Sequence, residues 1–176
     1  MLKKHSKFFE SLLLLADWFT LSLAWVSSYY LRFYSGIIPV YKGIPSFKIY
    51  LTLLVFMIPL WGLVFKVFGL YRPRRVSTRF YEILDIGKAS TFATLILISL
   101  TFLYRQYEFS RLTFFYFWLI NIVLLSLTRI LFREFLRFLR QKGYNQRYAL
   151  IIGTEKLGQG LAKQLQKHPE LGIQVS

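Results

Sequence analysis

The clearest pattern along the chain is a repetition of long apolar segments separated by short polar connections. Four segments reach the roughly 20 mostly apolar residues that a helix needs to cross the hydrocarbon core of a bilayer. We predict that they form membrane-spanning helices, over residues 8–33, 47–70, 83–104 and 112–132. The connections carry turn-forming residues, such as Gly36 and Pro39 after the first segment. Because the number of spans is even, both ends of the chain are expected on the same side of the membrane.

Beyond the fourth apolar segment the pattern becomes that of a basic amphipathic helix. Its arginines fall within about 80° of one another around a helix, and apolar residues occupy the other side. These arginines are Arg129, Arg133, Arg137 and Arg140. A helix of this kind lies along the inner surface of the membrane and contacts lipid head groups. Two interpretations stay open, a specific site for an anionic lipid or lipid-linked phosphate, and generic anchoring by positive charge.

A third pattern begins at Tyr148, where an apolar run ends in Gly153 and a helix-like segment follows to about Lys167. This is the start of a strand–turn–helix unit of a parallel α/β sheet. We therefore expect an all-α membrane protein with four transmembrane helices and a juxtamembrane helix over residues 1–142. An incomplete Rossmann-like domain follows over residues 143–176. One strand and one helix bury too little apolar surface to stay folded alone, so we expect the chain to be the front part of a longer protein.

The turn after Gly153 departs from the dinucleotide-binding pattern. That pattern has three glycines, and the middle one lets the backbone touch a pyrophosphate. Here Glu155 stands at the middle position, whereas Gly153 and Gly158 keep the positions that serve the turn and the helix packing. A carboxylate repels phosphate and fills the space of the ligand. Gly153 and Gly158 are thus weak candidates for cofactor binding, and we expect no cofactor in this chain.

Composition supports a bilayer as the solvent. The chain is 55% hydrophobic and 19% aromatic, and its formal net charge is +15. The basic residues flank the apolar segments, which indicates anionic lipids as partners and disfavours nucleic acid. The chain has no cysteine, which excludes disulfides and thiolate metal sites. The two histidines, His5 and His168, lack metal-ligand spacing, so no metal site is predicted.

Basic residues also predict the orientation. Three lysines lie at the N-terminus, five bases in or beside the second connection and six at or after the end of the fourth span, against three and two in or beside the other connections. The positive-inside rule then places both termini of a multi-pass membrane protein in the cytoplasm. The alternative for the first span is a cleaved signal peptide with Ser22-Leu23-Ala24 as its small-residue site. Asp17 inside the apolar run argues against it.

Charged residues within the apolar segments are candidates for function. Asp17 falls near the middle of the first span, where a carboxylate usually faces the interior of the bundle. A proton or substrate relay and a structural hydrogen bond are both open, and we favour the structural role because one isolated acid is too little for a transport path. Glu82, Asp85 and Lys88 are spaced as an interfacial ion cluster at the start of the third span.

Several motifs, taken in order, resemble a known family. They are Phe68-Gly-Leu-Tyr-Arg-Pro-Arg-Arg75, Glu108-Phe-Ser-Arg111, Arg140-Gln-Lys-Gly-Tyr-Asn145, Ala149-Leu-Ile-Ile-Gly-Thr-Glu-Lys-Leu-Gly158 and His168-Pro-Glu-Leu-Gly172. Over essentially the whole length, the chain resembles the N-terminal region of bacterial polyprenyl-phosphate hexose-1-phosphate transferases, which initiate exopolysaccharide synthesis. The resemblance implies four spans, a cytoplasmic Rossmann-like domain, and a later transferase domain that carries the catalytic, metal and sugar-nucleotide sites. No catalytic residue is assigned here, because none of that last domain is matched.

The resemblance implies a multi-pass module that anchors in the bacterial inner membrane and is inactive by itself. Its partners would be the bilayer, polyprenyl phosphate, further copies of the chain or other polysaccharide-assembly proteins. One alternative is the N-terminal part of a four-span nucleotide-sugar dehydratase or epimerase, which requires a complete glycine turn and a Tyr-x-x-x-Lys motif. The other is a stand-alone membrane scaffold or small transporter, which requires converging charges within the membrane.

Overall fold

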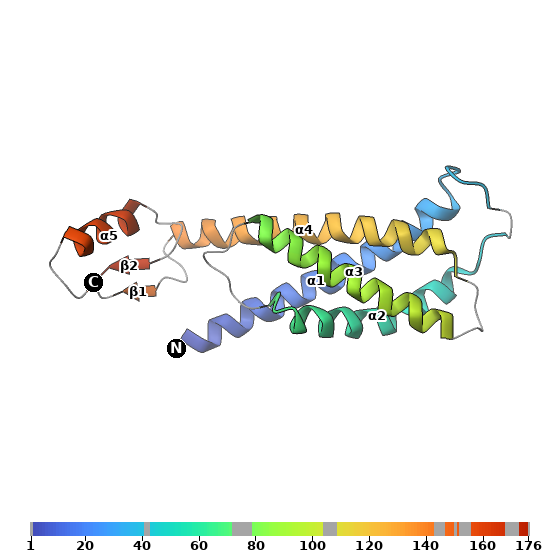
Figure 1. Ribbon diagram of the computed structural model, residues 1–176, viewed down its shortest axis with the longest axis horizontal. Coiled ribbons are helices and arrows are strands. Elements are labelled where there is room, and N and C mark those ends of the chain that lie inside the picture. Colours follow the sequence, from blue (N-terminus) through green and yellow to red (C-terminus); the bar gives the residue numbers. More distant parts are fainter. Residues whose placement is uncertain are drawn as a thin grey trace. The chain divides into compact units, whose positions relative to one another are not determined.

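A computed structural model of the chain describes residues 2–40, 43–71, 79–103, 109–142, 147–149, 151, 156–167 and 173–175. Four long helices dominate the described part (Figure 1). They are α1 (Leu2–Phe33), α2 (Phe47–Val67), α3 (Arg79–Leu103) and α4 (Arg111–Gln141). The chain divides into two units, and the first, Ser6–Thr128, contains the bundle formed by these helices. Within the bundle, successive helices run in alternating directions (Figure 1).

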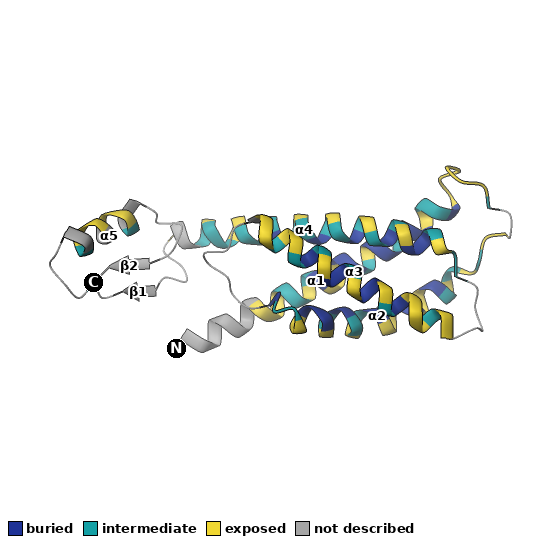
Figure 2. Cartoon of the chain, viewed as in Figure 1, coloured by how far each residue is buried: buried dark blue, intermediate teal, exposed yellow. Residues whose placement is uncertain are grey.

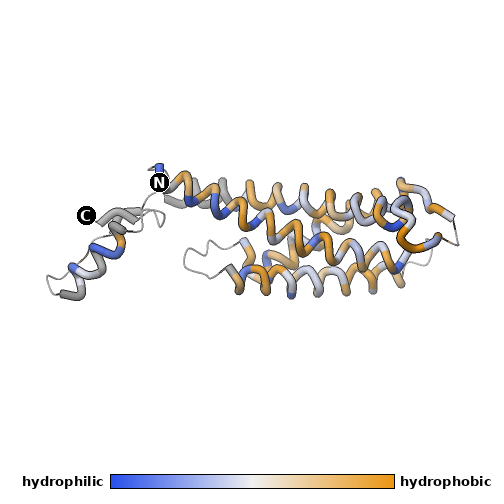
Figure 3. Tube along the Cα trace, turned by 90° about the horizontal axis from the view of Figure 1, so that it is seen from above, coloured by the Kyte–Doolittle hydropathy of each residue, from blue (hydrophilic) through white to orange (hydrophobic). Residues whose placement is uncertain are grey.

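The four predicted spans are confirmed as helices long and apolar enough to cross a membrane. Apolar positions recur along their length, as Figure 3 shows. The stretches that qualify are Glu10–Phe33, Phe47–Val67, Phe80–Leu103 and Arg111–Leu139. The predicted fourth span and the predicted amphipathic helix are one uninterrupted helix, α4, because neither glycine nor proline breaks the chain between them. These helices indicate a membrane protein.

The end of α2 differs from the predicted boundary at residue 70. The helix stops at Val67, and Gly69 adopts a left-handed conformation with φ of 68°. Its backbone N–H donates to the carbonyl of Lys66 at 3.1 Å, and that of Leu70 donates to the carbonyl of Phe65 at 3.0 Å. This pair of hydrogen bonds is a Schellman motif, in which glycine supplies the left-handed residue without steric cost. A glycine inside an apolar run is therefore the signal that ends this helix.

An aromatic cluster centred on Trp25 ties three helices together. The Trp25 ring is fully buried, and its centroid lies 5.6 Å from that of Tyr50 on α2. On α4, Phe114 and Phe117 lie 5.6 Å and 5.2 Å from it. The indole Nε1–H also donates to the backbone carbonyl of Tyr50 at 2.8 Å. Because hydrocarbon tails are as apolar as the side chains, such packing and hydrogen bonding, and not transfer out of water, hold membrane helices together.

Burial follows the faces that the helices turn toward one another (Figure 2). Small residues such as Ala24 and Ala93 have no exposed surface, which permits close approach of the backbones. Large apolar side chains point outward on every helix, among them Phe19, Val55 and Phe92, with exposures of 71%, 68% and 51%. In water these would be an aggregation hazard, and in a bilayer they are ordinary contacts with lipid.

The second unit comprises Met1–His5 and Arg129–Ser176, and it contains a short β–α–β segment. Strand β1 (Arg147–Ala149) precedes helix α5 (Lys156–Lys167) and strand β2 (Ile173–Val175). The strands pair in parallel, with Arg147 opposite Ile173. The helix ends at Lys167 as predicted. Each strand has three residues, and the Rossmann-like character of this segment stays a prediction.

Replacement of Trp25 by alanine should destabilise the bundle strongly. Truncation of a buried tryptophan typically costs about 3–5 kcal/mol, and here it also removes the hydrogen bond to α2. Phe19→Ala on the exposed face of the same helix is the matched control and should leave stability nearly unchanged. Thermal unfolding in detergent measures both, and equal midpoints would contradict the central role of Trp25.

Candidate functional site

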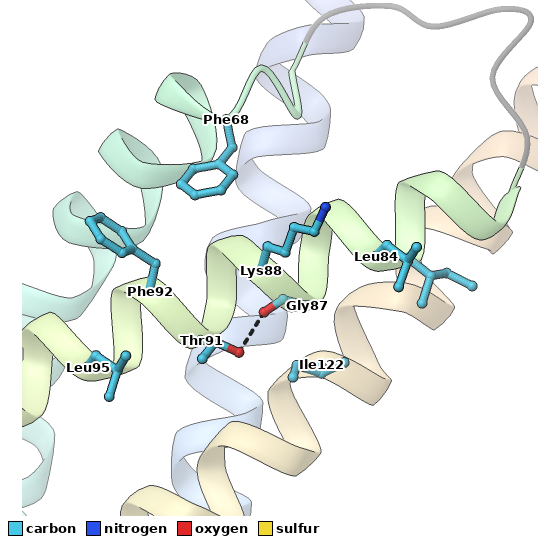
Figure 4. A pocket seen from close by; sticks show the side chains of 9 residues that line it. Phe68, Leu84, Gly87, Lys88, Thr91, Phe92, Leu95 and Ile122 are labelled. Atoms are coloured by element: carbon cyan, nitrogen blue, oxygen red, sulfur yellow. Dashed lines mark hydrogen bonds between the residues drawn. The ribbon is translucent and has the colours of Figure 1, made fainter.

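An apolar groove runs along the surface of the bundle over α3 (Figure 4). Its volume is about 640 Å³, within the usual range of ligand pockets. Most of the lining comes from one face of α3, at spacings of three and four residues. The nine lining residues are Phe68, Ile83, Leu84, Gly87, Lys88, Thr91, Phe92, Leu95 and Ile122. Phe68 follows the end of α2 and Ile122 belongs to α4, so all three helices shape the groove.

Gly87 leaves open space along the groove. A Cβ atom built at this position would meet nothing within 4 Å. A glycine inside a helix costs about 1 kcal/mol relative to alanine. The absence of a side chain therefore keeps the groove open at the expense of helix stability.

The polar atoms near Gly87 are satisfied within the protein. The hydroxyl of Thr91 donates to the carbonyl of Gly87 at 2.8 Å, as the dashed line in Figure 4 shows. The hydroxyl oxygen of Thr91 also accepts a hydrogen bond from Trp118 Nε1 on α4 at 3.0 Å. Thr91 is thereby held in place and links α3 to α4 beneath the groove.

Lys88 is the one charged residue among the nine that line the groove. Its side chain is exposed, and among the residues that the structure describes none forms an ion pair with it. The predicted ion cluster with Glu82 and Asp85 thus does not include Lys88. The groove was not predicted from the sequence. The feature that could have indicated it is a glycine inside an apolar span, Gly87, followed directly by the charged Lys88.

Asp17 is buried, with 4% of its surface exposed, as expected for a carboxyl that faces the protein interior. One turn further along α1, the hydroxyls of Thr20 and Thr128 lie 3.1 Å apart and link α1 to α4. Asn121 of α4 donates from Nδ2 to the hydroxyl of Ser90 on α3 at 3.4 Å. The interior of the bundle therefore contains polar contacts as well as apolar packing. The structural role favoured for Asp17 over a proton or substrate relay stays a prediction.

The four predicted lipid-contacting arginines occupy different environments. Arg129 is only 4% exposed, so its guanidinium is enclosed by protein in this structure, and its contact with lipid head groups stays a prediction. Arg133 and Arg137 are half-buried, and Arg137 donates to the carboxylate of Glu134 at 3.2 Å. The side chain of Arg140 lies outside the described residues. Helical spacing alone did not separate the buried Arg129 from the others.

The predicted glycine turn is only partly described. Gly153 lies outside the described residues, and Gly158 is half-buried in the first turn of α5. No group of three or more histidine, aspartate or glutamate side chains that could hold a metal occurs in the described part of the chain. The binding role of Gly153 and Gly158 therefore stays a prediction.

The four apolar helices indicate the class of protein, which is a membrane protein. A comparison with protein families shows the family within that class. A family model described as a CoA-binding domain matches residues 66–176, well over half of the chain. The chain belongs to this family. The match begins in the last turn of α2 and includes every residue that lines the groove. No curated protein and no solved structure matches the chain.

The family gives a context for function. The CoA-binding domain of this type is found in sugar transferase families, including the polyprenyl-phosphate hexose-1-phosphate transferases. This agrees with the resemblance carried by the sequence motifs and with a membrane anchor of four apolar helices.

Arg129 and Arg137 should respond differently to replacement by glutamine. Arg129 is buried, and removal of a buried charged hydrogen-bonding group costs about 2 kcal/mol. The surface pair of the half-buried Arg137 and the exposed Glu134 should contribute about 1 kcal/mol or less. Thermal unfolding of Arg129→Gln and Arg137→Gln in detergent compares the two, and equal losses would contradict the difference in environment.

Proposed function

We propose that these residues form the membrane-anchoring N-terminal module of a polyprenyl-phosphate sugar-1-phosphate transferase that acts in exopolysaccharide or other glycan biosynthesis. The transfer chemistry belongs to sequence other than these 176 residues. The observation that carries the proposal is the family match, which continues from the third and fourth apolar helices through β1, α5 and β2. A sugar transferase family and a membrane anchor are thus joined in one stretch of chain.

The proposed role of the anchor is to hold a transferase at the membrane surface where its lipid acceptor resides. A polyprenyl phosphate keeps its hydrocarbon in the bilayer and its phosphate at the interface. An enzyme tethered at that surface meets the acceptor in two dimensions, which raises the effective concentration of the reactants. The bundle core is filled by packed side chains such as Trp25, Met57 and Phe117, which suits an anchor better than a transport path.

The name of the family raises coenzyme A as a second candidate ligand. Coenzyme A carries several phosphate groups, and a helix N-terminus with a glycine turn is the usual way to bind them. In this chain Glu155 stands at the position of the close phosphate approach. We therefore propose that the Rossmann-like segment serves assembly and not cofactor binding.

The orientation follows from the basic residues, and reporter fusions test it. We predict that alkaline phosphatase fused after Ser176 is inactive and that a fluorescent protein at the same site is bright. The internal control is a fusion after Gly36, in the connection after α1, where the phosphatase should be active. A phosphatase that is active after Ser176 would contradict a cytoplasmic C-terminus.

A domain exchange tests the anchoring function. Residues 1–176 would replace the corresponding N-terminal region of a polyprenyl-phosphate hexose-1-phosphate transferase. We expect the chimera to form lipid-linked sugar phosphate in membranes, whereas residues 1–176 alone should form none. A transferase domain fused to an unrelated four-span bundle is the control for mere membrane attachment.

Two results would count against the proposal. A chimera that inserts and folds but has no activity would contradict a transferase module. Turnover by residues 1–176 alone would contradict the assignment of the chemistry to other sequence. The nucleotide-sugar dehydratase and epimerase alternative predicts instead that a chimera with such an enzyme is the active one.

A further inference from the structure

The groove over α3 has a chemistry that the anchoring function does not use. Its lining is almost entirely apolar, and it opens on the outward side of the bundle. Phe92 and Leu95 in its lining are 51% and 58% exposed, as expected of side chains that meet lipid. The surroundings of this groove in a membrane are therefore acyl chains and not water.

The shape of the groove favours one hydrocarbon chain lying along α3. Gly87 removes the side chain that would fill it, and the ring of Phe92 lies 6.0 Å from that of Phe68 beside it. Ile122 of α4 contributes to the lining as well. Because the groove is open toward the bilayer, the second acyl chain of a two-chain lipid can remain among the surrounding lipids, outside the groove.

The charge of the groove indicates the head group. The hydroxyl of Thr91 is occupied by its bonds with Gly87 and Trp118, so the ammonium of Lys88 is the polar side-chain group of the lining that is left for a ligand. In Figure 4 the side chain of Lys88 extends on the side of α3 where Phe68 lies. Lys88 lies five residues after the predicted start of the third span at residue 83, or about 8 Å at 1.5 Å per residue. Its side chain leans toward the N-terminus of α3 and is long enough to reach toward the interface, where the phosphate groups of lipids lie.

We propose that this groove binds an anionic phospholipid of the surrounding bilayer. One acyl chain lies along α3 beside Gly87, and the phosphate meets the ammonium of Lys88. The site is separate from the proposed transferase function, since it depends only on residues of the bundle.

A second copy of the chain fits the groove less well. A symmetric contact through this face would bring Lys88 of one copy toward Lys88 of the other, because a two-fold interface sets the same surface against itself. Two ammonium groups brought close together repel each other. An anionic lipid reverses that sign and neutralises the charge.

The test measures lipid retained by the purified protein. Native mass spectrometry would follow binding of phosphatidylglycerol and of zwitterionic phosphatidylcholine to the wild-type chain and to variants. We expect one tightly retained phosphatidylglycerol and a preference that falls about fivefold in Lys88→Gln, the effect of one base at a membrane surface. Lys66→Gln, an exposed lysine on α2 that does not line the groove, is the charge control and should keep the preference.

Filling the groove separates its shape from its charge. Gly87→Leu should abolish retention of the lipid, since its side chain would occupy the open space. Gly87→Ala raises helix propensity, leaves most of the space and should keep binding, which shows that the fold is intact. Phosphatidylglycerol with a photoreactive acyl chain should crosslink to residues 83–95.

Three outcomes would overturn the proposal. If the wild-type chain and Lys88→Gln retained phosphatidylglycerol and phosphatidylcholine equally well, the ammonium of Lys88 would have no role in binding. Displacement of phosphatidylglycerol by an equal concentration of polyprenyl phosphate would assign the groove to a different lipid. A dimer that dissociates in Gly87→Leu, with no crosslink to residues 83–95, would assign it to a second copy.

Discussion

A hydrocarbon solvent offers no hydrogen bonds, so each polar side chain on these long helices needs a partner inside the bundle. The structure meets much of this need within single helices, as where Thr94 donates to the carbonyl of Ser90 at 2.8 Å, and part of it by contacts between specific helix pairs. Thr20 meets Thr128, Ser90 meets Asn121, and Thr91 meets Trp118. Each such contact is worth only about 0.6 kcal/mol on average in membrane proteins. Their larger effect is on register, because a shift of one helix along another would break them and leave polar groups in an apolar medium.

Packing supplies most of the cohesion, and the cluster around Trp25 shows how. Its indole packs against the rings of Tyr50 on α2 and Phe117 on α4. The indole Nε1–H also donates a hydrogen bond to the backbone carbonyl of Tyr50. At the same end of the bundle, the hydroxyl of Tyr50 accepts the backbone N–H of Ser110 at 3.1 Å, and Arg32 donates to the Ser110 hydroxyl at 3.3 Å. Aromatic packing and hydrogen bonds thus stabilise together the end of the bundle where Trp25 and Tyr50 lie. The opposite half of the bundle carries the groove, where Gly87 leaves open space.

The sequence was sufficient to predict the number, length and approximate bounds of the spans, because hydropathy over about 20 residues is a strong signal. It also identified the family context through motifs after α2 and around β1. It did not reveal which arginine of the row is buried. Arg129 and Arg133 differ by one helical turn, and only the packing of neighbouring helices decides which is enclosed. The groove was not predicted for the same reason, since its lining combines residues of α3 and α4 with Phe68, which follows α2.

The left-handed glycine that ends α2 has a consequence for the mouth of the groove. Phe68 precedes Gly69 and is itself the capping residue, with its N–H bonded to the carbonyl of Val64 at 2.9 Å. The position of its ring is therefore dictated by a backbone turn and not by the regular geometry of a helix. Any residue with a Cβ at position 69 would incur roughly 1–2 kcal/mol of strain in that conformation. The shape of the groove beside Phe68 thus depends on the backbone conformation of a single glycine.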